Sequence, residues 1–250
     1  MRDLGPSQIH LWQYPIGDPP DGRHLAHAIT LLSDTEKNRY AAFHFEKHAA
    51  EYALSHAMLR LALSEYAPVR PDQWQFLTGE KGKPEIAAPA LDTPLWFNLS
   101  HTDGFAICVT GRVRHLGVDV ENMNRRTSYQ DLAQRFFAPS ESEYIRNLSP
   151  SLQREAFFRI WTLKEAYIKA DGRGLSIPLD SFCFRFPPET PTQVAFGSEG
   201  GSHAEANPAA WSFFEVPHEP DFRISVAVKN PGPSTLHLEC HQAADLFSQF

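Results

Sequence analysis

Hydrophobic and polar residues recur along the chain with two different periods, which separate strand segments from helical segments. Short apolar runs predict strands, and these cover residues 9–15, 94–100, 105–111, 115–121, 181–186, 193–197, 211–216 and 222–228. Apolar residues at helical spacing predict helices over residues 24–66, 128–137, 140–148 and 151–170. Each half of the chain therefore offers strands around a helical block.

Turn and cap residues mark the ends of several segments. HTDG at 101–104 contains an Asp-Gly turn signal and predicts a hairpin between the two strands that flank it. Ser140 and Glu143 have capping-box spacing, and the glycines of DGRG end the longest helix near residue 170. The link GRVRH at 111–115 is the best boundary, which predicts halves of residues 1–112 and 113–250.

The stretch HLGVDVENMN, residues 115–124, places two acids in an apolar strand. Alternation along a strand sends Asp119 and Glu121 to one face while Val118 and Val120 point into the core. Two carboxylates that close repel each other unless they share a proton, a basic partner or a hard cation such as Mg2+. A strand end whose acids simply face solvent remains the plain alternative.

Composition restricts the class of protein. With 250 residues and 42% hydrophobic side chains, the chain can bury a sizeable core. No window reaches the length of a membrane span and the N-terminus lacks the order of a signal peptide, so we expect a cytoplasmic protein. A formal net charge of -7 argues against general binding to nucleic acid or anionic membranes. The cysteines Cys108, Cys183 and Cys240 are widely spaced, which fits reduced core thiols.

Further candidate residues lie in three short motifs. The helix over 151–170 carries Lys164, Glu165 and Lys169, and the last two form an i, i+4 pair that as an exposed salt bridge contributes about 0.3–0.5 kcal/mol. GKP at 82–84 carries Lys83 in a turn, and Ser100 with His101 begins the predicted hairpin loop. Each motif is weak evidence when taken singly.

The order of these motifs is more informative than any one of them. GKP, then FNLSHTDG, then GVDVE, then WTLKEAYIKADGRGL resembles the 4'-phosphopantetheinyl transferases, specifically the larger class that activates peptide and polyketide synthases. The similarity covers about residues 33–186. It implies transfer of the phosphopantetheine arm of coenzyme A to a serine of an apo acyl or peptidyl carrier protein, with release of 3',5'-ADP.

The resemblance also implies a fold and a metal site. The expected fold is α+β, with two like-sized halves that form a pseudo-dimer within one monomeric chain and bind coenzyme A in the cleft between them. Asp119 and Glu121 match the family's magnesium ligands, and Glu165 matches the third carboxylate. Mg2+ would then neutralise charge on the pyrophosphate as the phosphorus is attacked.

By the same match, basic residues hold the phosphates of coenzyme A. The expected contacts are Arg39, Lys83, Ser100, His101, Lys164 and Lys169. A lysine position of the family near Arg39 is filled here by Glu36, which departs from the pattern. Glu165 is the favoured acceptor of the carrier serine's proton, with Lys169 or a bound water as the alternatives.

Two rival functions follow from the residues alone. His44 and His48 have i, i+4 spacing with Glu51 three residues further, which would suit a metallohydrolase if all three face one metal. The pattern lacks the glutamate of HExxH. The second rival is a non-catalytic module that binds carrier proteins or nucleotides. The intact triad of Asp119, Glu121 and Glu165 argues against it.

Overall fold

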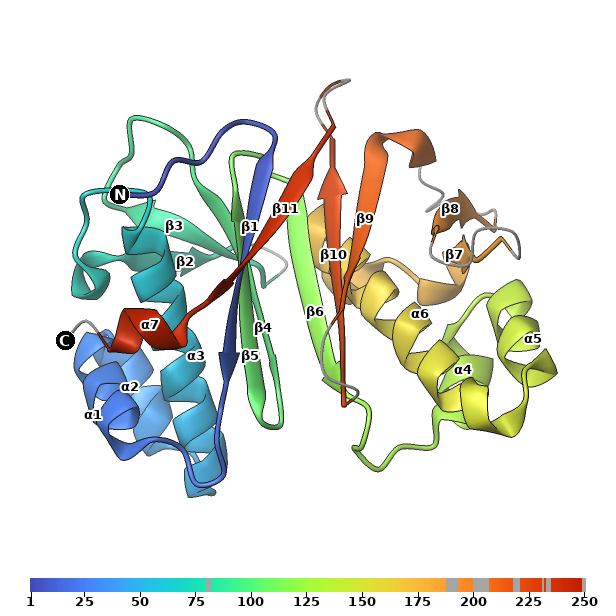
Figure 1. Cartoon of the computed structure of the whole chain (residues 1–250), viewed down its shortest axis with the longest axis horizontal. Coiled ribbons are helices and arrows are strands. Elements are labelled where there is room, and N and C mark those ends of the chain that lie inside the picture. The colour runs from blue at the N-terminus through green and yellow to red at the C-terminus, as the bar shows by residue number, and fades with distance from the viewer. Residues whose placement is uncertain are drawn as a thin grey trace.

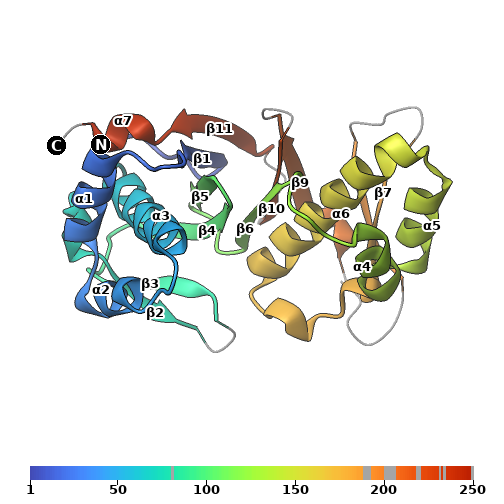
Figure 2. The ribbon, with the colours of Figure 1, turned by 90° about the horizontal axis from the view of Figure 1, so that it is seen from below.

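The computed structural model describes residues 1–79, 82–187, 193–199, 207–217, 221–230, 232 and 235–248. Two sheets lie side by side at the centre, and helices cover the outer side of each sheet (Figures 1 and 2). Each half thus combines a sheet with its own group of helices, which confirms the predicted α+β fold of two halves.

The sheet of the first half has the strand order β11–β1–β5–β4. Its strands are β1 (Gln8–Pro15), β4 (Trp96–Thr102), β5 (Phe105–Gly111) and β11 (His237–Gln242). The predicted hairpin between β4 and β5 is confirmed, and Gly104 has a φ of 83° in its turn, a conformation that glycine adopts without strain.

The predicted helix over residues 24–66 is divided into three helices. They are α1 (Gly22–Leu31), α2 (Asp34–Ala41) and α3 (Glu46–Ser64). Ser33 begins α2 with a capping box that includes Glu36, so the chain turns between α1 and α2. A hairpin of β2 (Gln75–Thr78) and β3 (Pro84–Ala88) follows α3 and was not predicted, because its residues are largely polar or half-exposed.

The sheet of the second half has the order β6–β10–β9, and a separate hairpin joins β7 to β8. The strands are β6 (Leu116–Asn122), β7 (Phe182–Arg185), β8 (Ala195–Ser198), β9 (Trp211–Val216) and β10 (Phe222–Lys229). The helices are α4 (Tyr129–Phe136), α5 (Pro139–Asn147) and α6 (Pro150–Asp171). These elements confirm the strands and helices that the hydrophobic pattern predicted for the second half.

Short 3-10 turns complete the fold. They comprise Pro71–Gln73, Gly174–Ser176, Leu179–Ser181 and Pro208–Ala210. Gly172 ends α6 with a φ of 87°, as the DGRG signal predicted. Within the described ranges, no helix is both long and apolar enough to cross a bilayer.

The predicted cap of α5 is wrong. The helix begins with Pro139, and the Glu141 carboxylate accepts from the Ala138 backbone N–H at 3.0 Å. Ser140 instead donates to Glu199 at 2.6 Å. Proline is favoured at the first helical position, so the helix begins at Pro139 and not at Ser140. The Ser-x-x-Glu pattern that begins at Ser140 predicted the cap there instead.

The end of the chain returns to the first half, contrary to the assignment of residues 113–250 to one unit. Strand β11 pairs in parallel with β1, and α7 (Ala244–Phe247) packs with Leu246 and Phe247 in the core of the first half. Figure 1 shows β11 crossing from the second half to the edge of the first sheet. The tail carries little hydrophobic periodicity, so the sequence did not reveal this return.

Candidate functional site

The two halves meet where β4 runs beside β6. Alternate β4 side chains reach across to the β6 backbone: Asn98 accepts from the Val118 N–H at 2.9 Å, and Thr102 accepts from the Asn122 N–H at 3.4 Å. The two strands belong to different sheets, so these side chains take the place of a backbone ladder. Ser100 lies between them on the same face of β4 and points at the acidic face of β6.

Helix α6 packs directly on that acidic face. A Cβ added to Gly117 would lie 2.2 Å from the Ala166 carbonyl oxygen and 2.4 Å from the Ala170 nitrogen, so only glycine permits this approach. Gly117, Asp119 and Glu121 share one face of β6 because they alternate along the strand. Close packing of the helix therefore brings its side chains onto both acids.

Asp119 is the centre of the polar contacts at this junction. Its Oδ1 accepts from Lys169 Nζ at 2.6 Å and from Ser100 Oγ at 3.0 Å, and Lys169 also donates to Ser100 at 2.9 Å. Asp119 is 5% exposed, and its buried Oδ2 has no hydrogen-bond partner among the residues that the structure describes. A buried carboxylate oxygen of this kind calls for a cation or donor from outside the chain.

Glu121 and Glu165 add two further carboxylates. Burial, with the nearby charge of Asp119, raises the pKa of each to about 7. Lys169 counteracts both shifts, and Arg125 and a hydrogen bond from Trp161 also counteract that of Glu121. Buried carboxylates beside another negative charge are those whose ionised form a cation would stabilise.

The carboxylates of Asp119, Glu121 and Glu165 fit a hard divalent cation, although their oxygens do not lie as close together as ligands of one ion would. They do not form a group whose ligand atoms all lie within 4.8 Å of one another; the described residues hold one such group, elsewhere. At the junction the Lys169 ammonium lies against Asp119 instead. Carboxylate oxygens are ligands that Mg2+ prefers, and the buried Oδ2 of Asp119, which has no partner among the described residues, can serve as one.

Lys83 reaches the same junction from the β2–β3 hairpin. Its Nζ donates to the carbonyl oxygens of Leu116 at 2.9 Å and Ala170 at 3.4 Å, and burial lowers its pKa to about 8. A cavity of about 260 Å³ lies beside it, lined by Gly82, Lys83, Pro84, Asn98, Leu99, Ile168, Lys169, Gly172 and Gly174. Another cavity, of about 390 Å³ beside Glu51, contains none of the predicted site residues.

Further basic groups lie near His101. The pKa of His101 is lowered by burial of its ring, although part of the residue reaches the surface, and by the positive charges of His56, Lys169 and Arg39. The guanidinium of Arg39 is exposed and lies over the ring of Tyr52 at 5.3 Å. His56 was not among the predicted site residues, although it lies in ALSHAMLR at 53–60, a stretch that the family resemblance covers.

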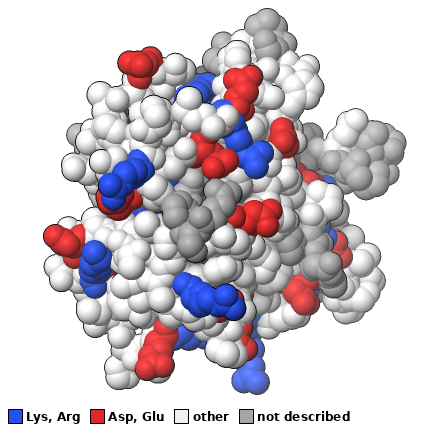
Figure 3. All heavy atoms as spheres, turned by 60° about the vertical axis from the view of Figure 1, so that its left-hand side comes forward, with Lys and Arg blue, Asp and Glu red and all other residues white. Residues whose placement is uncertain are grey.

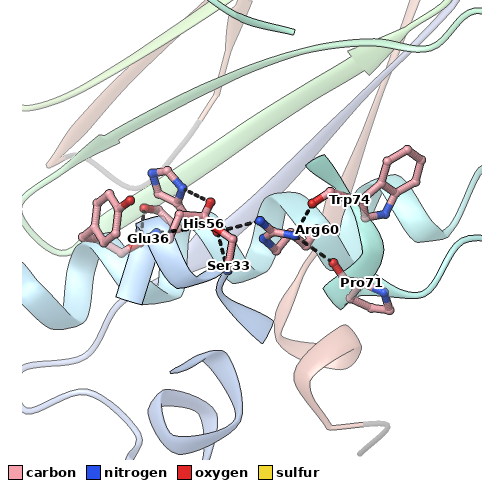
Figure 4. Close-up of polar contacts among 8 residues, drawn as sticks. Ser33, Glu36, His56, Arg60, Pro71 and Trp74 are labelled. Carbon is pink, nitrogen blue, oxygen red and sulfur yellow. Dashed lines mark hydrogen bonds and ion pairs between the residues drawn. The ribbon is translucent and has the colours of Figure 1, made fainter. Parts of the chain in front are cut away.

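Glu36 explains the departure seen in the sequence near Arg39. Figure 4 shows it within a buried network, where its carboxylate accepts from Arg60 at 2.5 Å and lies 2.9 Å from His56 Nδ1. Burial alone would raise the pKa of Glu36, but hydrogen bonds from His56 and Ser33 and the charge of Arg60 lower it to about 2. Glu36 therefore holds α2 against α3 and does not face the junction as a phosphate ligand would.

The chain is similar to known proteins over both of its halves. The 4'-phosphopantetheinyl transferase superfamily matches residues 115–227, and the family "4'-phosphopantetheinyl transferase, N-terminal" matches residues 19–112. The 4'-phosphopantetheinyl transferase HetI of Nostoc sp. is 32% identical over 225 residues, which cover 90% of this chain and 89% of HetI. The chain belongs to the 4'-phosphopantetheinyl transferase superfamily.

Other relatives agree with this assignment. The transferase Sfp of Bacillus subtilis is 26% identical over 204 residues, covering 81% of this chain and 84% of Sfp. A second Bacillus subtilis 4'-phosphopantetheinyl transferase is 32% identical over 157 residues, covering 63% of this chain and 67% of the relative. The protein is thus an enzyme that transfers phosphopantetheine from coenzyme A to carrier proteins, as the motif order predicted, and not a binding module.

The prediction that Lys164 binds coenzyme A is wrong. Lys164 has no exposed side-chain surface and pairs with Glu141 at 2.8 Å. Its ammonium also donates to the carbonyl oxygens of Leu179 at 2.6 Å and Phe182 at 2.7 Å. These acceptors lie in the core of the second half, so Lys164 cannot contact a phosphate at the junction. Its neighbour Glu165 points to the junction because successive helical residues lie about 100° apart.

The metallohydrolase alternative is also contradicted. His44 precedes α3, so it does not share a helical face with His48. Both exposed imidazoles instead pack edge-on against Phe45, with ring centroids 4.8 and 5.6 Å away. Glu51 is buried and accepts from the Gly104 N–H at 3.4 Å. The helix begins two residues later than the spacing assumed.

Trp161 opens the motif WTLKEAYIKADGRGL but was not among the predicted site residues. It lies four residues before Glu165, which lies four before Lys169, so the three form one stripe of α6. The indole hydrogen bonds to Glu121, and the ring packs on Phe157 with centroids 5.7 Å apart. Helical periodicity counted backward from Glu165 would have found it.

Proposed function

We propose that the junction of β4, β6 and α6 is the catalytic site of the transferase and that Asp119, Glu121 and Glu165 hold Mg2+. The buried Oδ2 of Asp119, which has no partner among the described residues, is the single observation that carries this proposal. Bound there, Mg2+ would neutralise charge on the pyrophosphate of coenzyme A while the phosphorus is attacked. Family membership supports the choice of cation and co-substrate.

The basic residues around the junction bind the phosphates of coenzyme A in this proposal. Lys83 and Lys169 line one cavity, and His101 lies close enough to Lys169 and Arg39 for their charges to lower its pKa. Figure 3 shows positive and negative side chains interspersed over one face of the molecule, which carries a formal net charge of -7 overall. A polyanionic substrate therefore depends on a local group of cations such as this one.

Ser100 has a positioning role here, not direct phosphate contact. Its hydroxyl donates to Asp119 and accepts from Lys169, which fixes both charged groups against β4. Lys169 can exchange these contacts for a phosphate oxygen when coenzyme A arrives, because its side chain is 29% exposed. The ammonium would then move from one anion to another without leaving the junction.

Glu165 is the proposed acceptor of the carrier serine's proton. Its side chain lies on the half-buried stripe of α6 that faces the junction, and its raised pKa of about 7 suits proton transfer near neutral pH. Lys169 is a weaker candidate, because its ammonium already donates to Asp119 and Ser100. A carboxylate that touches the metal loses proton affinity, so Glu165 would act while only weakly coordinated.

The acceptor substrate in this proposal is an apo acyl or peptidyl carrier protein.

The three cysteines are free, which suits a reducing cytoplasm. Cys240 is exposed, so the prediction that it is a core thiol is wrong. One chain supplies both halves of the junction, residues 1–112 with the returning tail and residues 113 to about 236. We therefore expect the protein to act as a monomer.

Intact mass spectrometry of an apo carrier protein tests the proposed function. The carrier is incubated with the enzyme and coenzyme A, once with Mg2+ and once with a chelator. We expect a mass increase equal to one phosphopantetheine group with Mg2+ and none with the chelator. An equal increase in both samples would contradict the metal assignment, and no increase with carriers of several classes would contradict the substrate assignment.

A further inference from the structure

A second cluster of metal-ligating side chains lies far from the junction, where β11 returns to β1. One ligand atom each from His10, Glu239 and His241 lie within 4.8 Å of one another. The parallel pairing of β1 with β11 sets His10 beside Glu239, and alternation puts Glu239 and His241 on one face. Residues from opposite ends of the chain thus converge on one point.

Both imidazoles present an unused nitrogen to this point. The side chain of His10 is 4% exposed and that of His241 is 10% exposed. The Nε2 atoms of both rings are buried and have no hydrogen-bond partner among the described residues. A buried imidazole nitrogen costs free energy unless it finds a proton donor, a proton acceptor or a metal.

The spacing of the ligand atoms suits a tetrahedral metal ion. The Glu239 carboxylate lies 3.7 Å from His10 Nε2 and 3.5 Å from His241 Nε2. Two ligands about 2.1 Å from a zinc ion at the tetrahedral angle lie roughly 3.4 Å apart. The two distances end at different oxygens of Glu239, Oε2 for His10 and Oε1 for His241, so its carboxylate lies between the two imidazoles.

Surrounding groups support neutral, metal-binding histidines. His10 Nδ1 lies 2.8 Å from the Tyr66 hydroxyl, and the oxygen of that hydroxyl accepts from the Trp12 indole at 2.9 Å. With its proton on Nδ1, His10 directs the Nε2 lone pair into the cluster, as outer partners of metal-bound histidines commonly arrange. Burial, and then the charge of the neighbouring histidine, lowers the pKa of His10.

The charged neighbours do not prevent a cation from binding. Arg2 is the positive group nearby, and it lowers the pKa of both histidines. Its guanidinium, however, pairs with Glu65 at 3.1 Å and lies over the Trp12 ring at 5.1 Å. Glu239 is 58% exposed, so an ion can enter from solvent and retain water as its fourth ligand.

We propose that His10, Glu239 and His241 form a zinc-binding site that fastens the C-terminal strand to the first half. Two histidines and one carboxylate are a ligand set that zinc accepts, and the site is distinct from the oxygen-only junction. A metal held by β1 and β11 would stabilise the folded chain in proportion to its concentration, because the unfolded chain separates the ligands. This site does not depend on the proposed function of the junction.

Zinc titration against a chromogenic chelator tests the proposal on tag-free, chelator-stripped protein. We expect one equivalent of Zn2+ to bind with an accompanying rise in Tm. Glu239→Gln and His241→Gln should each weaken binding at least about tenfold, a loss that even outer-shell changes produce. His237→Gln is the matched control, since this exposed histidine lies on the same strand outside the cluster, and it should bind as the wild type does.

Two further variants separate this site from other zinc ligands. Asp119→Asn should retain the zinc affinity, because it alters only the junction. Cys240→Ser should also retain it, and a Co2+ complex of the wild type should lack a thiolate charge-transfer band. Equal affinity in the wild type and Glu239→Gln, which alters an exposed side chain and should still fold, would overturn the proposal. Loss of binding in Cys240→Ser would overturn it too.

Discussion

Lys164 and Lys169 lie on the same helix and each pairs with one acid, but their surroundings differ. The Lys164 ammonium is fully enclosed by Glu141 and two backbone carbonyl oxygens in the second half. Lys169 is 29% exposed between the halves, and its partner Asp119 keeps one oxygen without a described partner. A charge with every contact supplied by the chain stabilises the fold, whereas an incompletely paired charge is available to a ligand.

The first half repeats this contrast. Glu36 is held by Arg60, His56 and its own helix cap, all from the same half. Lys83 instead reaches from the first half to carbonyl oxygens of the second, beside a cavity. Charged side chains that span the halves therefore mark the site, and those enclosed within one half hold its elements together.

Replacing Lys164 should break this comparison most strongly. Lys164→Met leaves the buried Glu141 without its cation and should lower the free energy of unfolding by about 3–5 kcal/mol. Urea denaturation measures the loss, and Lys37→Met, at an exposed lysine of α2, is the matched control. A stability equal to that of the control would show that the buried pair has no structural role.

Glu36 should behave as a structural charge with a defined pH dependence. Its folded pKa of about 2 lies below the ordinary 4.5, so its ionised form stabilises the fold above pH 4.5 and this contribution is lost as the pH falls toward 2. Glu36→Gln should therefore cost about 3 kcal/mol at pH 7 and progressively less below pH 4.5.

Urea denaturation from pH 7 down to pH 3 measures this difference between Glu36→Gln and the wild type. Glu143→Gln, at an exposed glutamate of α5, is the control and should follow the wild type throughout. A stability difference that stays constant with pH would contradict the assigned pKa.

Lys169 should affect the reaction far more than the fold. Lys169→Met removes the cation that positions Asp119 and that faces the substrate phosphates, which we expect to slow transfer about 10²–10³-fold. Initial rates by carrier-protein mass spectrometry, with circular dichroism of the same samples, separate the two effects. A normal rate would place Lys169 with Lys164 among the structural charges.

Lys83 should have the smallest of these effects, and on substrate binding above all. Lys83→Ala removes a charged hydrogen-bond donor, a loss of about 1.5–3 kcal/mol, which corresponds to a rise in KM for coenzyme A of roughly ten- to a hundredfold. Arg146→Ala, at an exposed position of α5, is the control. A lowered kcat with unchanged KM would contradict a phosphate-binding role.

Motif order and strand alternation revealed more of the molecule than helical spacing did. Alternation correctly placed Val118 and Val120 in the core, opposite Asp119 and Glu121, because a strand has only two faces. The spacing of His44 and His48 was misleading, since α3 begins after His44.

The burial of Lys164 and the return of β11 depend on contacts distant in sequence. Lys164 meets Glu141 and the chain around Leu179, and β11 meets β1 at the other end of the chain. No local pattern encodes such pairings, because they form only when whole elements pack. The same reason concealed the cluster of His10, Glu239 and His241.

The dependence of the transfer rate on Mg2+ concentration in Asp119→Asn tests the central claim most directly. Wild type and Asp131→Asn, an exposed aspartate of α4, serve as references. We predict that Asp119→Asn folds normally but transfers at least about a hundredfold more slowly, even with saturating Mg2+, because the amide cannot replace the carboxylate ligand. A wild-type rate at saturating Mg2+ would contradict the assignment of the junction as the metal and catalytic site.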